Sequence, residues 1–215
     1  MLDLALGGDP ARPLDILCIG AHSDDIEIGC GGTVLRLLTE RPGSHVRWVV
    51  LSSTEEREVE ARGSAADFLA AAGAAQVEVA SFRESYFPYA GAEIKDFFND
   101  LRRRADPDLV LCHHRHDEHQ DHRTVAQLAW NTWRNHLIAE YEIPKYEGDL
   151  GLPNLFVALP PAIAERKVQL LIKHFGSQHG KHWFRPEAFA GLMAVRGVEA
   201  GVSAAEAFHV RKLVV

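Results

Sequence analysis

The chain has 215 residues, 47% of them hydrophobic and 25% charged, as in ordinary globular proteins. This length favours one α/β domain over residues 1–215, with a core large enough to fold without disulfide bonds. The formal net charge of −7 argues against a nucleic-acid partner, because an acidic chain does not attract a phosphate backbone.

Cysteine usage and hydrophobic runs indicate the compartment. Cys18, Cys30 and Cys112 are odd in number and lack the C-x-x-C spacing, which is typical of reduced, buried thiols. The chain shows neither a basic segment followed by a long apolar one at its start nor a run of about 18 apolar residues. We therefore expect a soluble, cytoplasmic protein with no membrane span.

Short apolar runs alternate with helical patterns through the first two thirds of the chain. Strands are predicted at residues 14–21, 45–54, 75–80 and 109–114. Helices are predicted at residues 31–40, 55–73, 92–105 and 122–140, with Gly73 ending the second. This alternation predicts an α/β, Rossmann-like three-layer fold with a mostly parallel sheet and right-handed crossovers. In such folds the active site lies at the C-terminal ends of the strands.

The last third of the chain, from about residue 140, has a less regular pattern. Strand-like runs at residues 154–160 and 207–215 flank a helical pattern at residues 161–175. We expect this part to pack on the same domain.

A polar cluster, GAHSDDIEIGCGG at residues 20–32, follows the first predicted strand. His22 and Asp25 are three residues apart, so one helical turn places both on one side, while Asp24 points elsewhere. An imidazole and a carboxylate suit a divalent cation, but two ligands do not close a site. The equally weighted alternative is a helix cap in which Ser23, Asp24 or Asp25 accepts helix amides.

Two further features of this cluster have ordinary interpretations. Glu27 either lies beside a metal or favourably charges the first helical turn. The glycines are interpreted as a tight strand-to-helix turn, because they lack the G-x-G-x-x-G spacing of a phosphate-binding loop: Gly29, Gly31 and Gly32.

A second cluster follows the fourth predicted strand. Five of the chain's twelve histidines lie within ten residues: His113, His114, His116, His119 and His122. His119 and His122 are three apart, with Asp121 beside His122 and Asp117 one turn back. One of these histidines would complete a site of three protein ligands with an open position for water, as in catalytic zinc enzymes. The alternative is a solvated polar loop.

Both clusters resemble motifs of one family, the LmbE-like (PIG-L) N-acetyl-sugar deacetylases. AHSDDIEIGCGG is similar to their A-H-P-D-D-x-E…G-G segment, and HRHDEHQDHR to their H-x-x-D-x-H-x-D-H segment. Weaker similarities follow in the family's order at residues 57–73, 141–160, 177–180 and 196–208. Ser23 departs from the pattern, since the family usually has proline there, and this change should loosen the turn slightly.

The resemblance implies roles for individual residues. It implies His22, Asp25 and His122 as zinc ligands, and Asp24 as the general base on the zinc-bound water. It also implies His119 as a protonated partner for the oxyanion or the leaving amine, with Asp121 orienting it. Spacing alone does not decide between His119 and His122 as the ligand.

Residues outside the two clusters bear on the substrate. The resemblance implies that Arg57 contacts substrate, whereas without it Arg57 would be a surface residue paired with Glu58 or Glu60. The segment at residues 177–187 is expected either to line the substrate, with His182 in contact, or to be a surface loop. Exposed aromatics at Trp183 and Phe184 hint at a homo-oligomer.

The predicted function is therefore a zinc-dependent hydrolase that removes an acetyl group from an N-acetylated amino sugar or glycoconjugate. Zinc lowers the pKa of bound water to about 7, a carboxylate takes the proton, and an imidazolium stabilises the oxyanion. The alternatives are a zinc amidase for a non-sugar amide such as a thiol conjugate, and a metal-binding homologue without catalysis. Fe²⁺ or Co²⁺ would suit the same ligands.

Overall fold

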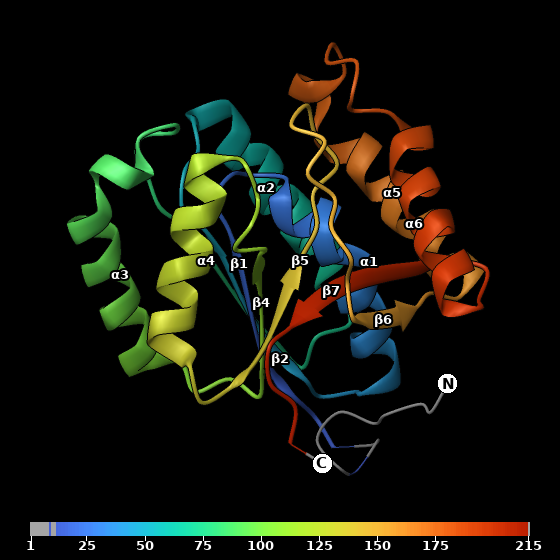
Figure 1. Ribbon diagram of the computed structural model, residues 1–215, viewed down its shortest axis with the longest axis horizontal. Coiled ribbons are helices and arrows are strands. Elements are labelled where there is room, and N and C mark those ends of the chain that lie inside the picture. Colours follow the sequence, from blue (N-terminus) through green and yellow to red (C-terminus); the bar gives the residue numbers. More distant parts are fainter. Residues whose placement is uncertain (1–8, 10–11, 215) are drawn as a thin grey trace.

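The computed structural model describes residue 9 and residues 12–214. Residues 1–8, on which the expected absence of a leader peptide depends, residues 10–11 and Val215, the last residue of a predicted strand, lie outside the described residues. The described chain forms a seven-stranded sheet in the order β3-β2-β1-β4-β5-β7-β6, flanked by helices (Figure 1).

The strands of the sheet are β1 (Asp15–Gly20), β2 (His45–Val50), β3 (Ala74–Val79), β4 (Leu109–His113), β5 (Leu137–Tyr141), β6 (Leu155–Ala158) and β7 (Ala205–Val210). The helices are α1 (Asp25–Glu40), α2 (Glu55–Phe68), α3 (Gly91–Arg104), α4 (Gln120–Trp133), α5 (Pro161–His174) and α6 (Pro186–Ala200). Two short 3₁₀ turns, η1 (Phe87–Tyr89) and η2 (Gly176–Gln178), complete the order. β1 to β5 pair in parallel, and β7 runs antiparallel between β5 and β6.

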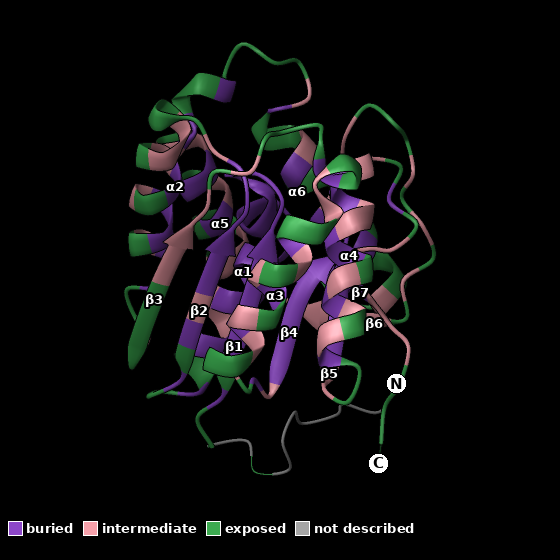
Figure 2. Ribbon diagram, turned by 90° about the vertical axis from the view of Figure 1, so that its left-hand side faces the viewer, coloured by how far each residue is buried: buried purple, intermediate pink, exposed green. Residues whose placement is uncertain are grey.

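Helices cover both faces of the sheet, which confirms the predicted three-layer α/β architecture. α3 and α4 cover one face, and α1, α5 and α6 the other (Figure 1). β1 contributes to both cores, because Ile16 and Cys18 point to one face and Leu17 and Ile19 to the other. The central strands are therefore buried throughout, as Figure 2 shows for β4, and their sequences are apolar rather than alternating.

The glycines of the first cluster lie inside α1, so their interpretation as a tight turn was wrong. α1 begins at Asp25, six residues before the predicted start. A Cβ at each glycine would collide with a packed neighbour: at Gly29 with Tyr141 (2.2 Å), at Gly31 with Phe68 (2.6 Å), and at Gly32 with Leu159 (2.7 Å) and Glu206 (2.9 Å). Glycine is needed here because side chains from α2, β5, β7 and the residue after β6 pack directly against the helix backbone.

Two predicted boundaries also change. α2 ends at Phe68 and not at Gly73, whose Cα faces the backbone of Gly43, so that a Cβ would lie 2.6 Å from Gly43 O. The predicted helix at 122–140 is α4 followed by the buried strand β5, which pairs in parallel with β4. Leu137–Tyr141 is apolar enough for either structure, and the place beside β4 in the sheet decides it.

Other expectations concern burial. The three cysteines are free and buried, as predicted. Phe184 is only 3% exposed and packs among core aromatics, so the expected exposed aromatic at this position was wrong. Among the described residues, no helix combines the length and the apolar character that a membrane crossing requires.

Candidate active site

The two polar clusters meet at the C-terminal ends of β1 and β4. These strands are hydrogen-bonded neighbours, so the segments that follow them lie side by side. We call residues 21–25, between β1 and the first turn of α1, the metal loop. His119 and His122 belong to the start of α4, which faces the metal loop.

Three candidate ligand residues bring their ligand atoms toward one another. His22 Nδ1 lies 3.2 Å from His122 Nε2 and 3.3 Å from Asp25 Oδ2. The other carboxylate oxygen, Asp25 Oδ1, lies 3.5 Å from His122 Nε2. Ligand atoms around tetrahedral zinc, at about 2.0–2.2 Å from the ion, are roughly 3.3–3.6 Å apart. The separations between these atoms therefore lie close to those of zinc ligands, with Asp25 Oδ2 near His22 and Asp25 Oδ1 near His122.

The outer nitrogen of each histidine faces a second carboxylate. His22 Nε2 lies 3.2 Å from Asp121 Oδ2, and His122 Nδ1 lies 3.0 Å from Asp117 Oδ2. When each outer nitrogen carries the proton that it donates to its carboxylate, both inner nitrogens present lone pairs to each other. Two lone pairs and a carboxylate need a cation between them, and carboxylate–imidazole–metal chains have this arrangement.

The histidine pKa values show how a metal-free site meets that need. Burial opposes protonation of His22, but Asp25 and Asp121 outweigh it and raise its pKa to about 10. Burial and the nearby His113 lower the pKa of His122 to about 4. One proton on His22 then lies between the two imidazoles, in the place of the cation.

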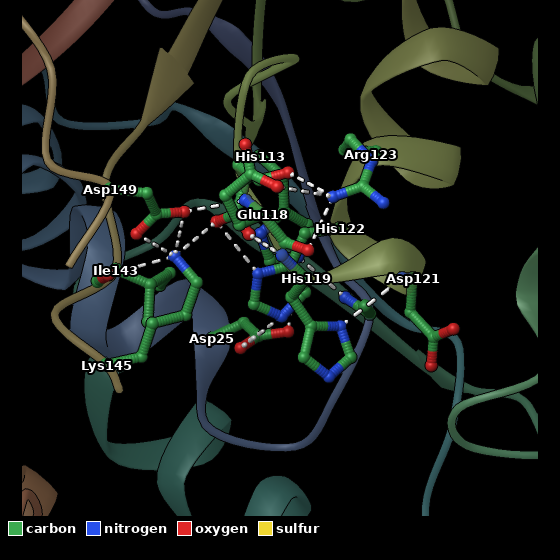
Figure 3. Close-up of polar contacts among 12 residues, drawn as sticks. Asp25, His113, Glu118, His119, Asp121, His122, Arg123, Ile143, Lys145 and Asp149 are labelled. Atoms are coloured by element: carbon green, nitrogen blue, oxygen red, sulfur yellow. Dashed lines mark hydrogen bonds and ion pairs between the residues drawn. The ribbon is translucent and has the colours of Figure 1, made fainter. Parts of the chain in front are cut away.

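His113, at the end of β4, belongs to the site although the sequence pattern does not single it out from its neighbours. It is fully buried, its ring stacks 3.9 Å from that of His122, and its Nε2 lies 3.1 Å from Asp25 Oδ2 (Figure 3). The amide of Ala21 donates to the same Nε2 at 3.0 Å.

Within residue 9 and residues 12–214, two groupings of three residues bring ligand atoms within 4.8 Å of one another. They are His22, His119 and His122, and Asp25, His113 and His122. His122 is common to both, which places it at the centre of the site. In the second grouping the Nε2 lone pair of His113 already accepts the Ala21 amide, so a metal would have to compete for it.

Asp24 has one bound and one free carboxylate oxygen. It is the N-cap residue of α1, yet its side chain makes no cap hydrogen bond, contrary to the helix-cap alternative for this residue. Its Oδ1 lies 2.9 Å from the Arg57 guanidinium, while its buried Oδ2 has no hydrogen-bond partner in the part of the chain that the structure describes. Burial raises the pKa of Asp24, and Arg57 limits the rise.

Arg57 faces the metal loop rather than the surface. Its side chain is 15% exposed and pairs with Asp24. Of the two surface partners considered from the sequence, Glu58 pairs with Arg62 at 2.8 Å and Glu60 accepts the Ser177 hydroxyl at 2.6 Å. The surface alternative for Arg57 was therefore wrong.

Asp121 contacts a different histidine from the one expected. Its carboxylate lies 3.2 Å from His22 Nε2 and accepts the amides of Ser85 at 2.6 Å and Phe87 at 3.1 Å. His119, the N-cap of α4, is instead held through its Nδ1, which accepts the Asp121 amide at 3.3 Å. A neutral His119 therefore carries its proton on Nε2. Burial is the larger cause that lowers the pKa of His119, and the positive charge of His22 is the second.

Two remaining residues make no hydrogen bond to the ligand atoms among the described residues. Glu27 is fully buried within α1, neither of its carboxylate oxygens has a hydrogen-bond partner among the described residues, and burial raises its pKa to about 8. His182 is exposed on the segment after η2, where its Nδ1 lies 3.3 Å from the Tyr146 hydroxyl. No contact among the described residues joins His182 to the ligand atoms.

Comparison with known proteins gives one family and a set of related folds. Residues 17–133, more than half of the chain, match the model of the family PIG-L, described as GlcNAc-PI de-N-acetylase. The uncharacterized deacetylase YaiS of Escherichia coli K12 is 28% identical over 187 residues, covering 81% of this chain and 97% of YaiS.

Solved structures share the fold at low identity. The N,N'-diacetylchitobiose deacetylase of Pyrococcus horikoshii superimposes with a TM-score of 0.70 at 23% identity, over 96% of this chain and 88% of the other. GalB, the 4-carboxy-2-hydroxymuconate hydratase of Pseudomonas putida, superimposes with a TM-score of 0.75 at 20% identity, over 94% and 98%. The fold therefore carries more than one kind of reaction, and fold similarity alone does not identify this one.

Proposed function

The chain belongs to the PIG-L family of metal-dependent deacetylases, and we propose that it removes the acetyl group from an N-acetylated amino sugar or glycoconjugate. The family match supports amide hydrolysis. The sugar is supported by the family description and by the chitobiose deacetylase of similar fold. The cytoplasmic location, the single domain and a homo-oligomer stay predictions.

We propose His22, Asp25 and His122 as the ligands of a zinc ion. The observation that carries this assignment is the approach of His22 Nδ1 and His122 Nε2 to 3.2 Å, with a carboxylate behind each ring. A zinc ion held here would lower the pKa of a bound water to about 7 and polarise the amide carbonyl. Fe²⁺ or Co²⁺ would fit the same nitrogen and oxygen ligands.

Asp24 is the general base in this proposal. Its free Oδ2 accepts the proton of the attacking water, because Oδ1 is already occupied by Arg57. The raised pKa brings the carboxylate closer to the pH at which it must both take and release a proton. A site that only stored metal would have no use for this buried, half-satisfied carboxylate.

His119 stabilises the developing negative charge. Its Nε2–H donates a hydrogen bond to the carbonyl oxygen as negative charge develops there, and the proton that Asp24 has taken from the water passes to the leaving amine, because a neutral imidazole has no proton to give up. The Asp121 amide fixes the ring through Nδ1, so the main chain of Asp121 orients His119 while its side chain orients His22. The neutral ring is sufficient for the first step, in agreement with its lowered pKa.

Arg57 acts on Asp24 rather than on substrate in this proposal, since its guanidinium pairs with that carboxylate. His182 stays a candidate substrate residue, together with Tyr146, because both are exposed and contact each other across two loops. These loops join β5 to β6 and α5 to α6.

A substrate panel tests the proposal. The protein is stripped of metal, reloaded with zinc, and assayed for acetate release from N-acetylglucosamine, N,N'-diacetylchitobiose, an N-acetylglucosaminyl lipid and a non-sugar thiol-conjugate amide. We expect zinc-dependent release from an amino sugar. Acetate release from the thiol conjugate alone would show that the substrate is a non-sugar amide. If the protein bound no divalent metal, the proposal of a metal-dependent deacetylase would be wrong. The hydratase substrate of GalB serves as the control for a different reaction on this fold.

A further inference from the structure

Two adjacent residues of the metal loop are anchored on the segment that begins α2. Ser23 is fully buried, and its hydroxyl lies 2.9 Å from Ser53 Oγ, in the connection between β2 and α2. Asp24 Oδ1 lies 2.9 Å from Arg57, in the first turn of α2. The metal loop is therefore attached at two points to one short segment, residues 53–57.

The direction of the Ser23–Ser53 hydrogen bond follows from the second contact of Ser53. Its hydroxyl donates to the carbonyl oxygen of Thr54 at 3.0 Å. A hydroxyl carries one proton, so Ser53 has none left for Ser23. Ser23 therefore donates and Ser53 accepts.

The contacts continue from Ser53 to Asp24. Thr54 is the N-cap of α2, and its hydroxyl accepts the Arg57 amide at 3.4 Å. Arg57 reaches back to Asp24, which is covalently next to Ser23. The contacts therefore form a closed ring from Ser23 through Ser53, Thr54, Arg57 and Asp24 back to Ser23. Each contact restricts the position of the Arg57 guanidinium relative to the Asp24 carboxylate.

We propose that Ser53 is a positioning residue, which receives the Ser23 hydroxyl and so fixes the start of α2 where Arg57 holds Asp24 Oδ1. This inference rests on the proposed function of Asp24 as the base. With Oδ1 held, Oδ2 stays directed at the reacting water. Without Ser53 the start of α2 shifts, so that Arg57 no longer holds Asp24 Oδ1.

The direction of the hydrogen bond makes the two serines unequal. Ser53→Ala leaves the buried Ser23 donor without an acceptor, whereas Ser23→Ala leaves Ser53 bonded to Thr54. We expect Ser53→Ala to lower kcat about tenfold or more, because small displacements of a catalytic group have large effects on rate. KM and zinc content stay unchanged. Ser23→Ala has a smaller effect, and the double variant resembles Ser23→Ala.

Two further variants separate positioning from general loss of structure. Ser53→Thr keeps the hydroxyl at a half-buried position and should restore most of kcat. Thr39→Ala removes an exposed hydroxyl that donates to the Leu35 carbonyl oxygen at 2.9 Å in the last turn of α1, away from the metal loop, and should leave kcat unchanged. An unchanged kcat in Ser53→Ala, no rescue by threonine, or an equal loss in Thr39→Ala would each overturn the proposal.

Crystal structures keep the test independent of the proposed function. If the zinc-loaded wild type hydrolyses no amide in the panel, the proposed function is wrong. The position of the Asp24 carboxylate in the Ser53→Ala crystal structure is then still compared with its position in the wild type. Separation of Arg57 from Asp24 in Ser53→Ala, with the 2.9 Å contact present in the wild type, supports the inference. An Arg57–Asp24 contact that persists in the variant contradicts it.

Discussion

His22 Nδ1 and His122 Nε2 face each other at 3.2 Å, and each ring has a carboxylate at its outer nitrogen. In the metal-free protein a proton on His22 separates the two lone pairs. A metal ion and this proton therefore exclude each other, and the acid–base properties of the site follow from that exclusion.

Zinc affinity should depend on pH through His22. Because its pKa is about 10 in the metal-free fold, zinc must displace one proton throughout the neutral range. The apparent affinity should rise about tenfold per pH unit between pH 6 and 8. Competition with a chelator in metal buffers measures the affinity, and calorimetry in two buffers measures the released proton. An affinity independent of pH would show that the proton is not there.

The same proton should affect the stability of the metal-free protein. The folded pKa of His22, about 10, lies above its unfolded value of about 6.5. The contribution of this group to the free energy of unfolding is therefore complete below about pH 6.5 and disappears as the pH rises through 10. Thermal unfolding from pH 6.5 to 9, with and without zinc, should show this decline in the metal-free sample and a smaller one in the loaded sample.

The two adjacent aspartates should separate catalysis from metal binding. Asp24→Asn is expected to keep zinc and to lose about 10²–10⁴ in kcat, since the base is gone. Asp25→Asn should lose zinc, because the ligand charge is gone. Metal content by atomic absorption and kcat on the best amide of the panel measure both. Asp100→Asn, on the exposed side of α3, is the matched control. A fully active, metal-loaded Asp24→Asn would remove the base assignment.

Asp121 and His119 should likewise differ. Asp121→Asn should weaken zinc binding about 10- to 100-fold, the usual effect of removing a carboxylate behind a histidine ligand. His119→Ala should bind zinc with unchanged stoichiometry and lose turnover. Zinc titration of both variants decides which histidines bind the metal. A loss of zinc in His119→Ala would favour the ligand set His22, His119 and His122 over the set with Asp25.

The glycines of α1 should be sensitive to a single methyl group. Gly32→Ala places a Cβ 2.7 Å from Leu159 and 2.9 Å from Glu206, and is expected to lower the free energy of unfolding by about 1–3 kcal/mol. Gly191→Ala in α6 meets nothing within 4 Å and should raise it by about 0.5–1 kcal/mol. Chemical denaturation measures both. If Gly32→Ala raised the free energy of unfolding as Gly191→Ala should, the side chains around Gly32 would have to adapt to the added methyl group.

The sequence predicted the parts of the fold that depend on local pattern. The strand–helix alternation and the meeting of the two polar clusters followed from apolar periodicity and from the rule for sites at strand ends, whereas the choice of His122 over His119 came from the family resemblance. The partners of Asp121 and Arg57 did not, because each lies in a segment far along the chain: Asp121 reaches His22 over 99 positions. The role of Gly32 could not be predicted for the same reason: the sequence does not show which distant side chain packs against a glycine.

Glu206, on the last strand, accepts the amides of Gly32 and Thr33 at 2.8 and 2.6 Å, and Lys167 bonds both to Glu206 and to the Ile28 carbonyl at 2.6 Å. In the helix that presents Asp25, backbone amides are thus bound by a residue that follows Gly32 by 174 positions. During synthesis a growing chain contains both metal-site clusters long before this contact can form. Competence to retain the metal should therefore arise late in folding, after β7 has emerged from the ribosome.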